Sequence, residues 1–171
     1  AGETSRARTL IGQARAASAG PPHPYLEQLA ALIELEAGEP RAALAIADRA
    51  IAQSGPTRAL SRVRVRALSE QKHWQAAVEA AAQALDSARN DTELWALLAR
   101  AQAARGDQAA AHVAMAELHT INGAWAAAIE QLQAAQRSRQ LDFYDSSRLD
   151  ARLRELRALF FQEREDRRSG R

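Results

Sequence analysis

A sequence repeat runs through the middle of the chain and constrains its fold more than any other feature. Gly38, Lys72 and Gly106 are evenly spaced along the chain, and four further sets of positions share their interval. These sets are Pro40, Trp74 and Gln108; Ala43, Ala77 and Ala111; Ala47, Ala81 and Met115; and Ala50, Ala84 and Leu118. The interval matches the period of about 34 residues that is typical of stacked helix–turn–helix units. The repeat therefore predicts an all-α solenoid built from pairs of helices.

The composition favours the same fold class. Ala provides about a quarter of the 171 residues, and Leu, Arg, Glu and Gln are also abundant, whereas Val, Ile, Thr and the aromatic residues are sparse. The abundant residues are the strongest helix formers, and the sparse ones are those that favour strands. The repeated small residues follow steps of four and three, which place them on one helix face where a neighbouring helix can approach closely.

Turn and capping residues divide the repeat region into helix pairs. Gly38 and Gly106 stand where a helix must end in a left-handed residue before the chain reverses. Pro56 and the Asn90-Asp91 pair lie between units, where Pro or an Asp or Thr cap begins the next helix. We expect paired helices at 24–37 and 39–53, 58–71 and 73–88, and 92–105 and 107–121.

The stretch "NGAWAAAIEQL" at 122–132 starts another second-helix pattern half a period early, because Gly123 follows Gly106 by half of the repeat interval. A damaged repeat has no reason to keep half the period, so we interpret the helix at 107–121 as shared between two units. The sharing should redirect the superhelix and let the C-terminal helix fold back on the array. The face directed at the preceding unit is assigned Ala111, Met115 and Leu118. The face directed at the following unit is assigned His112, Met115, Ala116 and His119.

The two flanks differ from the repeats. We expect a leading helix at 3–18 within a segment 1–23 that is the tail of a preceding repeat or a connector. The repeats occupy 24–57, 58–91, 92–121 and a fourth unit that ends at 138. Residues 139–171 should form a linker and a capping helix at 145–167, with Asp145 and Ser146 as its caps and a frayed basic tail. Its core positions are Leu149, Leu153, Leu156 and Phe160, at heptad-like spacing.

The third unit resembles the tetratricopeptide repeat, with Trp95, Leu98, Ala99, Gly106 and Ala111 at matching positions and Asp91 as a cap. The resemblance implies a right-handed superhelix. The segment 94–157 is also similar to the C-terminal end of periplasmic zinc metalloproteases of Gram-negative bacteria that carry tetratricopeptide arrays. Its most telling elements are "GDQAAAH", "AELHTINGAWAAAIEQL" and "FYDSSRLDARLREL".

This second resemblance implies a periplasmic location and an N-terminal protease domain with a His-Glu-x-x-His zinc motif. The motif is missing here, since the four histidines are His23, His73, His112 and His119 and no two are four residues apart. We therefore expect a non-catalytic portion of a longer protein that begins before Ala1, with zinc held only by the other domain. The family implies partners in the outer-membrane β-barrel assembly machinery and its substrates, and contact in cis with the protease domain.

The inner groove of such an array is lined by the first helix of each unit. The repeat assigns Tyr25, Gln28, Arg62, Arg66, Glu93 and Arg100 to a groove that binds polypeptide partners, with Leu32, Glu36, Glu70 and Ala96 at neighbouring groove positions. Arg62, Arg66 and Arg100 would form a basic patch for carboxylates or backbone carbonyls. The alternative is a solvated face on which these arginines pair with Glu70 and Glu93. Binding of a C-terminal carboxylate by Lys and Asn is disfavoured, because the groove has neither.

Other functions find less support in the residues. The formal net charge of +2 argues against an RNA-binding repeat, and Trp74, Trp95 and Trp125 are interpreted as packing residues because no basic stripe accompanies them. His112 and His119 are seven residues apart, too far for two zinc ligands on one helix turn, and are also interpreted as packing. No apolar run approaches the roughly 18 residues that a membrane-spanning helix needs, so no transmembrane segment is expected. A stand-alone scaffold of a secretion or pilus system remains the alternative function.

The arginines of the C-terminal helix have two interpretations. They alternate with acidic residues at spacings that allow salt bridges, including Asp150–Arg154 and Glu163–Arg167. A solvated capping helix is the simpler interpretation, and contact with phosphate or anionic lipid is the alternative. The arginines are Arg148, Arg152, Arg154, Arg157, Arg164, Arg167 and Arg168.

Overall fold

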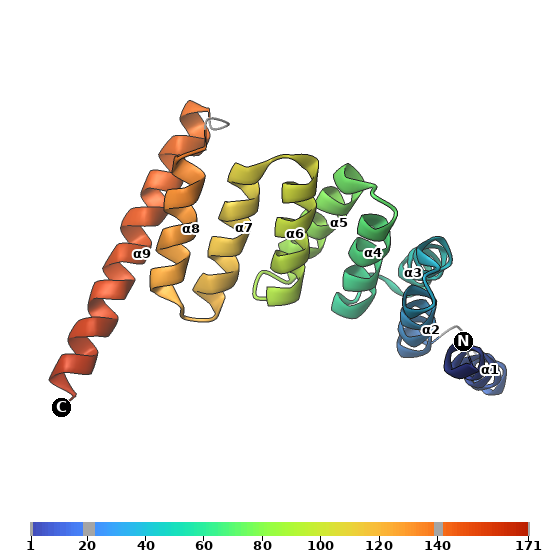
Figure 1. The fold of residues 1–171 in the computed structure, drawn as a ribbon. Helices are drawn as coiled ribbons and strands as arrows, with labels where there is room; N and C mark the ends of the chain where they lie inside the picture. The colour runs from blue at the N-terminus through green and yellow to red at the C-terminus, as the bar shows by residue number, and fades with distance from the viewer. Residues whose placement is uncertain (1, 19–22, 139–141, 171) are drawn as a thin grey trace. The chain divides into compact units, whose positions relative to one another are not determined.

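The computed structural model describes residues 2–18, 23–138 and 142–170, and these residues are almost entirely helical (Figure 1). The described residues form nine α-helices and no strand, which confirms the all-α class. The helices are α1 (Gly2–Ala17), α2 (Pro24–Glu36), α3 (Pro40–Ser54), α4 (Arg58–Glu70), α5 (Trp74–Ser87), α6 (Thr92–Arg105), α7 (Gln108–Ile121), α8 (Trp125–Gln136) and α9 (Phe143–Ser169). The expected linkers include residues 19–22 and 139–141, which lie outside the described residues.

The chain divides into a first unit, Ala1–Arg89, and a second unit, Asn90–Arg171. The division falls at the boundary between the second and third sequence repeats. The first unit contains α1 to α5 and the second contains α6 to α9. The right-handed superhelix remains a prediction. No helix in the described part of the chain is both long enough and apolar enough to span a membrane.

Local side chains explain where the helices begin. The Thr57 side chain accepts a hydrogen bond from the backbone N–H of Leu60 at 3.2 Å, and Asp91 Oδ1 accepts one from Leu94 at 3.1 Å. Each bond satisfies an N–H group that has no partner inside the first helical turn. These are the Thr and Asp caps that the sequence predicts, and the expected helix boundaries agree with the observed ones to within two residues.

Left-handed residues end the first helix of each pair. Gly38 and Gly106 have φ angles of 75° and 94°, as the sequence predicts, and Gly123 has a φ of 70°. Lys72 takes the same conformation at the equivalent position, with a φ of 60°, and is the one non-glycine residue in the described chain with a positive φ. The sequence repeat therefore preserves a backbone conformation even where it does not preserve glycine.

In the first unit, each helix packs against the next one along the chain, and α2 also contacts α4. Contact between the first helices of two successive pairs is what stacking of helix pairs requires. The core between them consists of small and branched side chains, as the repeated alanines predict. Its buried members are Ala31, Leu35, Ala43, Ala47, Val63 and Ala67.

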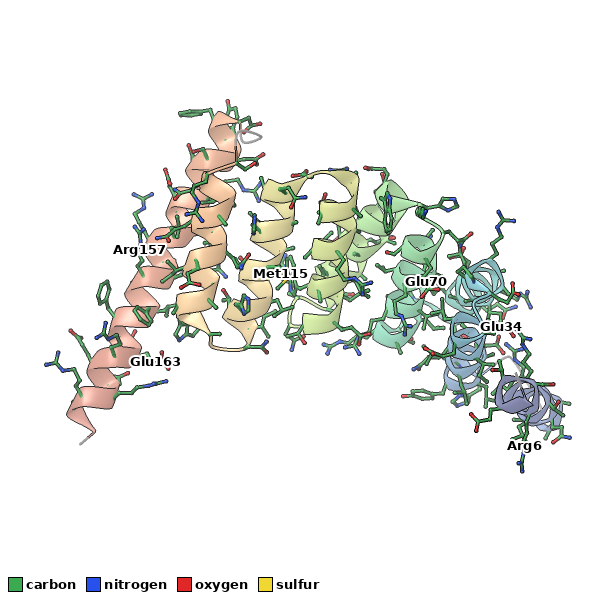
Figure 2. The ribbon with its side chains drawn as sticks, viewed as in Figure 1. Arg6, Glu34, Glu70, Met115, Arg157 and Glu163 are labelled. Atoms are coloured by element: carbon green, nitrogen blue, oxygen red, sulfur yellow. The ribbon has the colours of Figure 1, made fainter. Side chains whose placement is uncertain are left out.

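Two arginines join α1 to α2. Arg8 donates to both carboxylate oxygens of Glu34, and Arg15 donates to both carboxylate oxygens of Glu27. The Glu27 side chain is 7 % exposed, so its charge depends on Arg15 for compensation. In Figure 2, Glu34 lies on the side of α2 that faces α1. The leading helix is therefore attached to the first pair by paired charges, and Ile11 is its one buried residue.

In the second unit, α7 packs against α6 and against α8, and α9 packs against α8. Ala116 belongs to the buried cluster formed with α8 and α9, and His112 Nδ1 donates to Gln131 Oε1 of α8 at 2.8 Å. Ala111 is also buried, and lies roughly 140° from Ala116 around the helix axis. The helix α7 therefore packs against both of its neighbours in the chain, and its assignment to two repeat units stays a prediction.

The long helix α9 differs from its predicted form at both ends. It begins after Asp142, whose Oδ1 accepts from the Asp145 N–H at 2.7 Å, so neither Asp145 nor Ser146 is the cap. Its charged end is helical to Ser169, and Glu163 and Arg167 pair there at 2.6 Å one turn apart, while fraying of this tail stays a prediction. Three of its four predicted core leucine and phenylalanine positions are buried, namely Leu149, Leu153 and Leu156.

Candidate functional site

The first unit brings several of the predicted groove residues onto two adjacent helices. Tyr25 and Gln28 lie on α2, and Arg62 and Arg66 lie on α4, which contacts α2. Arg66 Nη2 reaches Glu36 Oε1 of α2 at 3.5 Å, so this arginine pairs across the two helices and not with Glu70 on its own helix. The α2 and α4 helices therefore bring basic and acidic side chains together, and their role as a groove stays a prediction.

The aromatic residue Tyr25 is exposed on the α2–α4 face. Its side chain is 75 % exposed and stacks on His23, with 5.4 Å between the ring centroids. An exposed aromatic ring on a face that also carries arginines is typical of protein-binding surfaces. Tyr25 is therefore a candidate for contact with a partner.

The remaining predicted groove residues, Glu93 and Arg100, lie on α6 in the second unit, and both are exposed. The second unit has its own hollow, and a different face of α6 lines it. That face carries Trp95, Leu98 and Gln102, which follow at steps of three and four. The two sets are about 160° apart around the helix, since Trp95 follows Glu93 by two positions and each position turns the helix by about 100°.

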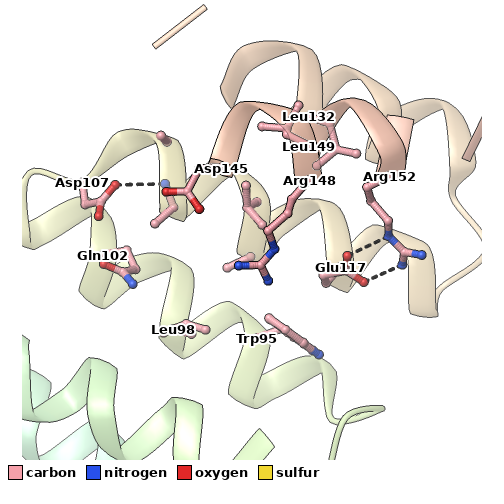
Figure 3. A pocket seen from close by; sticks show the side chains of 14 residues that line it. Trp95, Leu98, Gln102, Asp107, Glu117, Leu132, Asp145, Arg148, Leu149 and Arg152 are labelled. Carbon is pink, nitrogen blue, oxygen red and sulfur yellow. Dashed lines mark hydrogen bonds and ion pairs between the residues drawn. The ribbon is translucent and has the colours of Figure 1, made fainter. Parts of the chain in front are cut away.

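The hollow is a cavity of about 500 Å³ that is lined by residues of α6, α7, α8 and α9 and is open to solvent on one side (Figure 3). Its size falls within the range of about 300 to 1,000 Å³ that is usual for ligand pockets. The apolar part of the wall combines Leu98 of α6 with Val113 of α7, Leu132 of α8 and Leu149 of α9. The Trp95 side chain, half-buried, lies at its side.

Two of the acidic groups in the wall are already bonded. Glu117 accepts from Arg152 Nε at 2.9 Å and Nη2 at 2.7 Å, and Arg152 Nη1 also donates to Glu155 at 2.7 Å. Burial lowers the pKa of Arg152, but these hydrogen bonds raise it by more, so its pKa lies above the ordinary value. Asp107 caps α7 through the Ala110 N–H at 3.0 Å and also pairs with an arginine on α6.

Three other polar groups in the wall are not bonded in this way. Arg148, one turn before Arg152, has no hydrogen bond or ion pair with the residues that the structure describes. The Asp145 carboxylate, one further turn back, is exposed and also lines the cavity. Gln102 Oε1 is shielded from solvent and has no hydrogen-bond donor among the described residues. Figure 3 shows Arg148 and Gln102 on facing walls, from α9 and α6.

The sequence pattern alone does not indicate the cavity. It favours packing for Trp95 and a solvated face for Arg148. Trp95 is half-buried and Arg148 is exposed, and both also line the hollow, which the sequence pattern does not indicate. Packing does describe Trp125, which lies against the core of the second unit. The available signal is the spacing of Asp145, Arg148 and Arg152 on one face of α9, together with the expectation that α9 folds back on the array.

The salt bridges expected on α9 are found in part. Glu163 and Arg167 are paired as predicted, whereas Asp150 accepts a hydrogen bond from Gln136 Nε2 of α8 in place of one from Arg154. The half-buried His112 contacts α8, in agreement with its packing interpretation. Comparison with known proteins adds no assignment, since no family model and no curated protein matches the chain.

Proposed function

We propose that this chain is a non-catalytic domain that binds polypeptide partners, built as a tetratricopeptide array. The parent protein is a periplasmic zinc metalloprotease similar to the β-barrel assembly-enhancing protease. The array recruits components of the outer-membrane β-barrel assembly machinery, or barrel substrates, and contacts the protease domain in cis. It acts by shape and charge complementarity and supplies no chemistry of its own.

The observation that carries this proposal is the position of the cavity within the sequence. All of its lining residues, from Trp95 to Arg152, lie inside the segment 94–157 that resembles the metalloprotease family. A fold alone does not indicate a function, because many repeat proteins share it. A cavity of ligand-binding size within the resembling segment supports a binding role for that segment.

The surface formed by α2 and α4 in the first unit supports the same binding role. The α2–α4 face carries exposed Tyr25 and the arginines Arg62 and Arg66. Stacked helix pairs use such faces to bind extended partners. The protease assignment itself is tested by the coding sequence upstream of Ala1, where a His-Glu-x-x-His helix is expected.

The binding role is tested by cross-linking the intact protein to the β-barrel assembly machinery. A triple variant, Arg62→Ala, Arg66→Ala and Arg100→Ala, removes the predicted arginines of the groove. We expect it to lose most of the captured partner, because arginine pairs with carboxylates and backbone carbonyls.

The matched control removes the same charge from exposed arginines elsewhere, by Arg41→Ala, Arg49→Ala and Arg154→Ala. This control should capture the partner as the unaltered protein does. Equal capture by both triple variants would rule out the groove, and no capture by the unaltered protein would rule out this partner.

A further inference from the structure

We propose that the cavity of the second unit binds an extended segment of a partner polypeptide in which an acidic side chain adjoins an apolar one. This inference rests on the proposed polypeptide-binding function and adds to it a site and a ligand chemistry. The acidic side chain pairs with Arg148, the apolar side chain enters the leucine-lined part, and a backbone N–H donates to Gln102 Oε1 (Figure 3).

The charge of the ligand follows from the two arginines of the cavity wall. Arg152 is held by Glu117 and Glu155, so its donors are directed at groups within the protein. Arg148 has no such partner among the described residues and lines the same cavity. A planar guanidinium in a partly enclosed site pairs best with a carboxylate, which it can bind through two parallel hydrogen bonds.

The apolar part of the ligand follows from the apolar residues of the wall. Beside the buried Leu149 of α9, Leu98 of α6 and Val113 of α7 are half-buried and line the cavity. An apolar side chain that covers them removes their surface from water, and burial of such a surface stabilises a complex. The cavity therefore selects for an apolar residue next to the acidic one, and a purely acidic segment would leave this wall uncovered.

The need for a backbone donor follows from Gln102. Its Oε1 is shielded from water and has no donor among the described residues. A sheltered acceptor without a partner is unfavourable, so a ligand N–H that bonds to it, once the Gln102 amide has turned toward the cavity, contributes to affinity. An extended peptide presents such N–H groups along its length, because they are not used in a helix.

Asp145 opposes the acidic ligand. Its carboxylate lines the cavity one turn before Arg148 and has no hydrogen bond or ion pair with the described residues. Two like charges in one cavity repel each other, so Asp145→Asn should strengthen binding of the acidic peptide several-fold. This expectation distinguishes an acidic ligand from a basic one, for which the same substitution would weaken binding.

The test is a selection from a random heptapeptide display library on the intact protein and on its Arg148→Glu variant. The matched control is Arg154→Glu, which changes the same charge on an exposed part of α9 outside the cavity. We expect peptides selected by the unaltered protein and by the control to combine Asp or Glu with an apolar neighbour. The Arg148→Glu variant should instead select peptides with Lys or Arg.

Binding of synthetic peptides then checks the contact. Changing the selected Asp to Asn should weaken binding to the unaltered protein about tenfold, the effect of losing one charge-assisted hydrogen bond. Ala110→Leu fills the cavity without changing charge and should weaken binding of every selected peptide. Circular dichroism of each variant verifies that it remains helical.

The results of the peptide selection test the cavity site and the polypeptide-binding function separately. Selected peptides that lack an acidic preference, or that bind the Arg148→Glu variant equally, overturn this site while supporting polypeptide binding. Selection of no peptide, together with no cross-linked partner, overturns both the site and the proposed function.

Discussion

Glu117 on α7 accepts two hydrogen bonds from the guanidinium of Arg152 on α9, at 2.9 Å from Nε and 2.7 Å from Nη2. The two residues are 35 positions apart in the sequence, and the whole of α8 lies between their helices along the chain. Both side chains are about three-quarters buried. This pair therefore fixes α9 against α7 at the wall of the cavity.

Replacement of Glu117 by Gln should destabilise the second unit by about 1–2 kcal/mol, because the amide keeps the shape but loses the charge of a two-bond carboxylate. The partial exposure of the pair moderates the loss. Urea unfolding measures the change. Glu163→Gln is the matched control, since its pair with the exposed Arg167 should contribute less than about 0.5 kcal/mol. Equal effects of the two substitutions would contradict a structural role for the Glu117 pair.

The sequence predicts the helices well because their signals are local. Thr57 and Asp91 cap helices with their own side chains, and Gly38 and Gly106 end them with their own backbone conformation. The predicted start of α9 is wrong by two residues for a related reason. Asp142 and Asp145 are one turn apart, and the side chain of either can cap a helix. The residue types alone therefore do not show at which of them α9 begins.

The cavity is not predictable in the same way. Trp95 and Arg148 both line it although they lie on helices separated by two others. The repeat fixes which face of a helix is apolar, but it does not fix which residues of α6 and α9 face each other. That relationship depends on how α9 packs on α8, which follows the cluster of Leu132 and Leu153 and lies outside the repeat period.

Removal of the Arg15 side chain should destabilise the first unit. Glu27 is buried and both of its oxygens accept from Arg15, so Arg15→Ala leaves a carboxylate with little compensation. We expect a loss of about 1–3 kcal/mol, below the value for a fully buried pair because Arg15 itself is 35 % exposed. Guanidinium unfolding measures it. The exposed Arg6 provides the control, and Arg6→Ala should change stability by less than about 0.5 kcal/mol.

Partial rescue distinguishes the charge from the packing. If the buried charge causes the loss, Arg15→Ala combined with Glu27→Gln should be more stable than Arg15→Ala alone. A double variant no more stable than the single one would show that Arg15 acts through its aliphatic stem.

Lys72→Gly should stabilise the protein. Lys72 has a φ of 60° at the position where the other two repeats carry Gly38 and Gly106. A side chain in the left-handed conformation is strained by about 1 kcal/mol, which glycine relieves, although glycine loses more backbone entropy on folding. We expect a net gain of about 0.5 kcal/mol from these two opposed effects, seen as a higher melting temperature. Lys72→Ala is the control, and an equal gain there would assign the effect to loss of the charge.

Gln102→Met should separate stability from binding at the cavity. Methionine has nearly the same shape as glutamine and replaces the sheltered Oε1, which has no donor in the described structure, by a group that needs none. We expect the free energy of unfolding to rise by about 1 kcal/mol, because an unsatisfied acceptor is removed. Affinity for the acidic–apolar peptides should fall by several-fold, since the acceptor for their N–H is lost. Thermal unfolding and fluorescence titration provide the two measurements, and loss of both stability and affinity would mean that Gln102 holds the fold and does not contact the ligand.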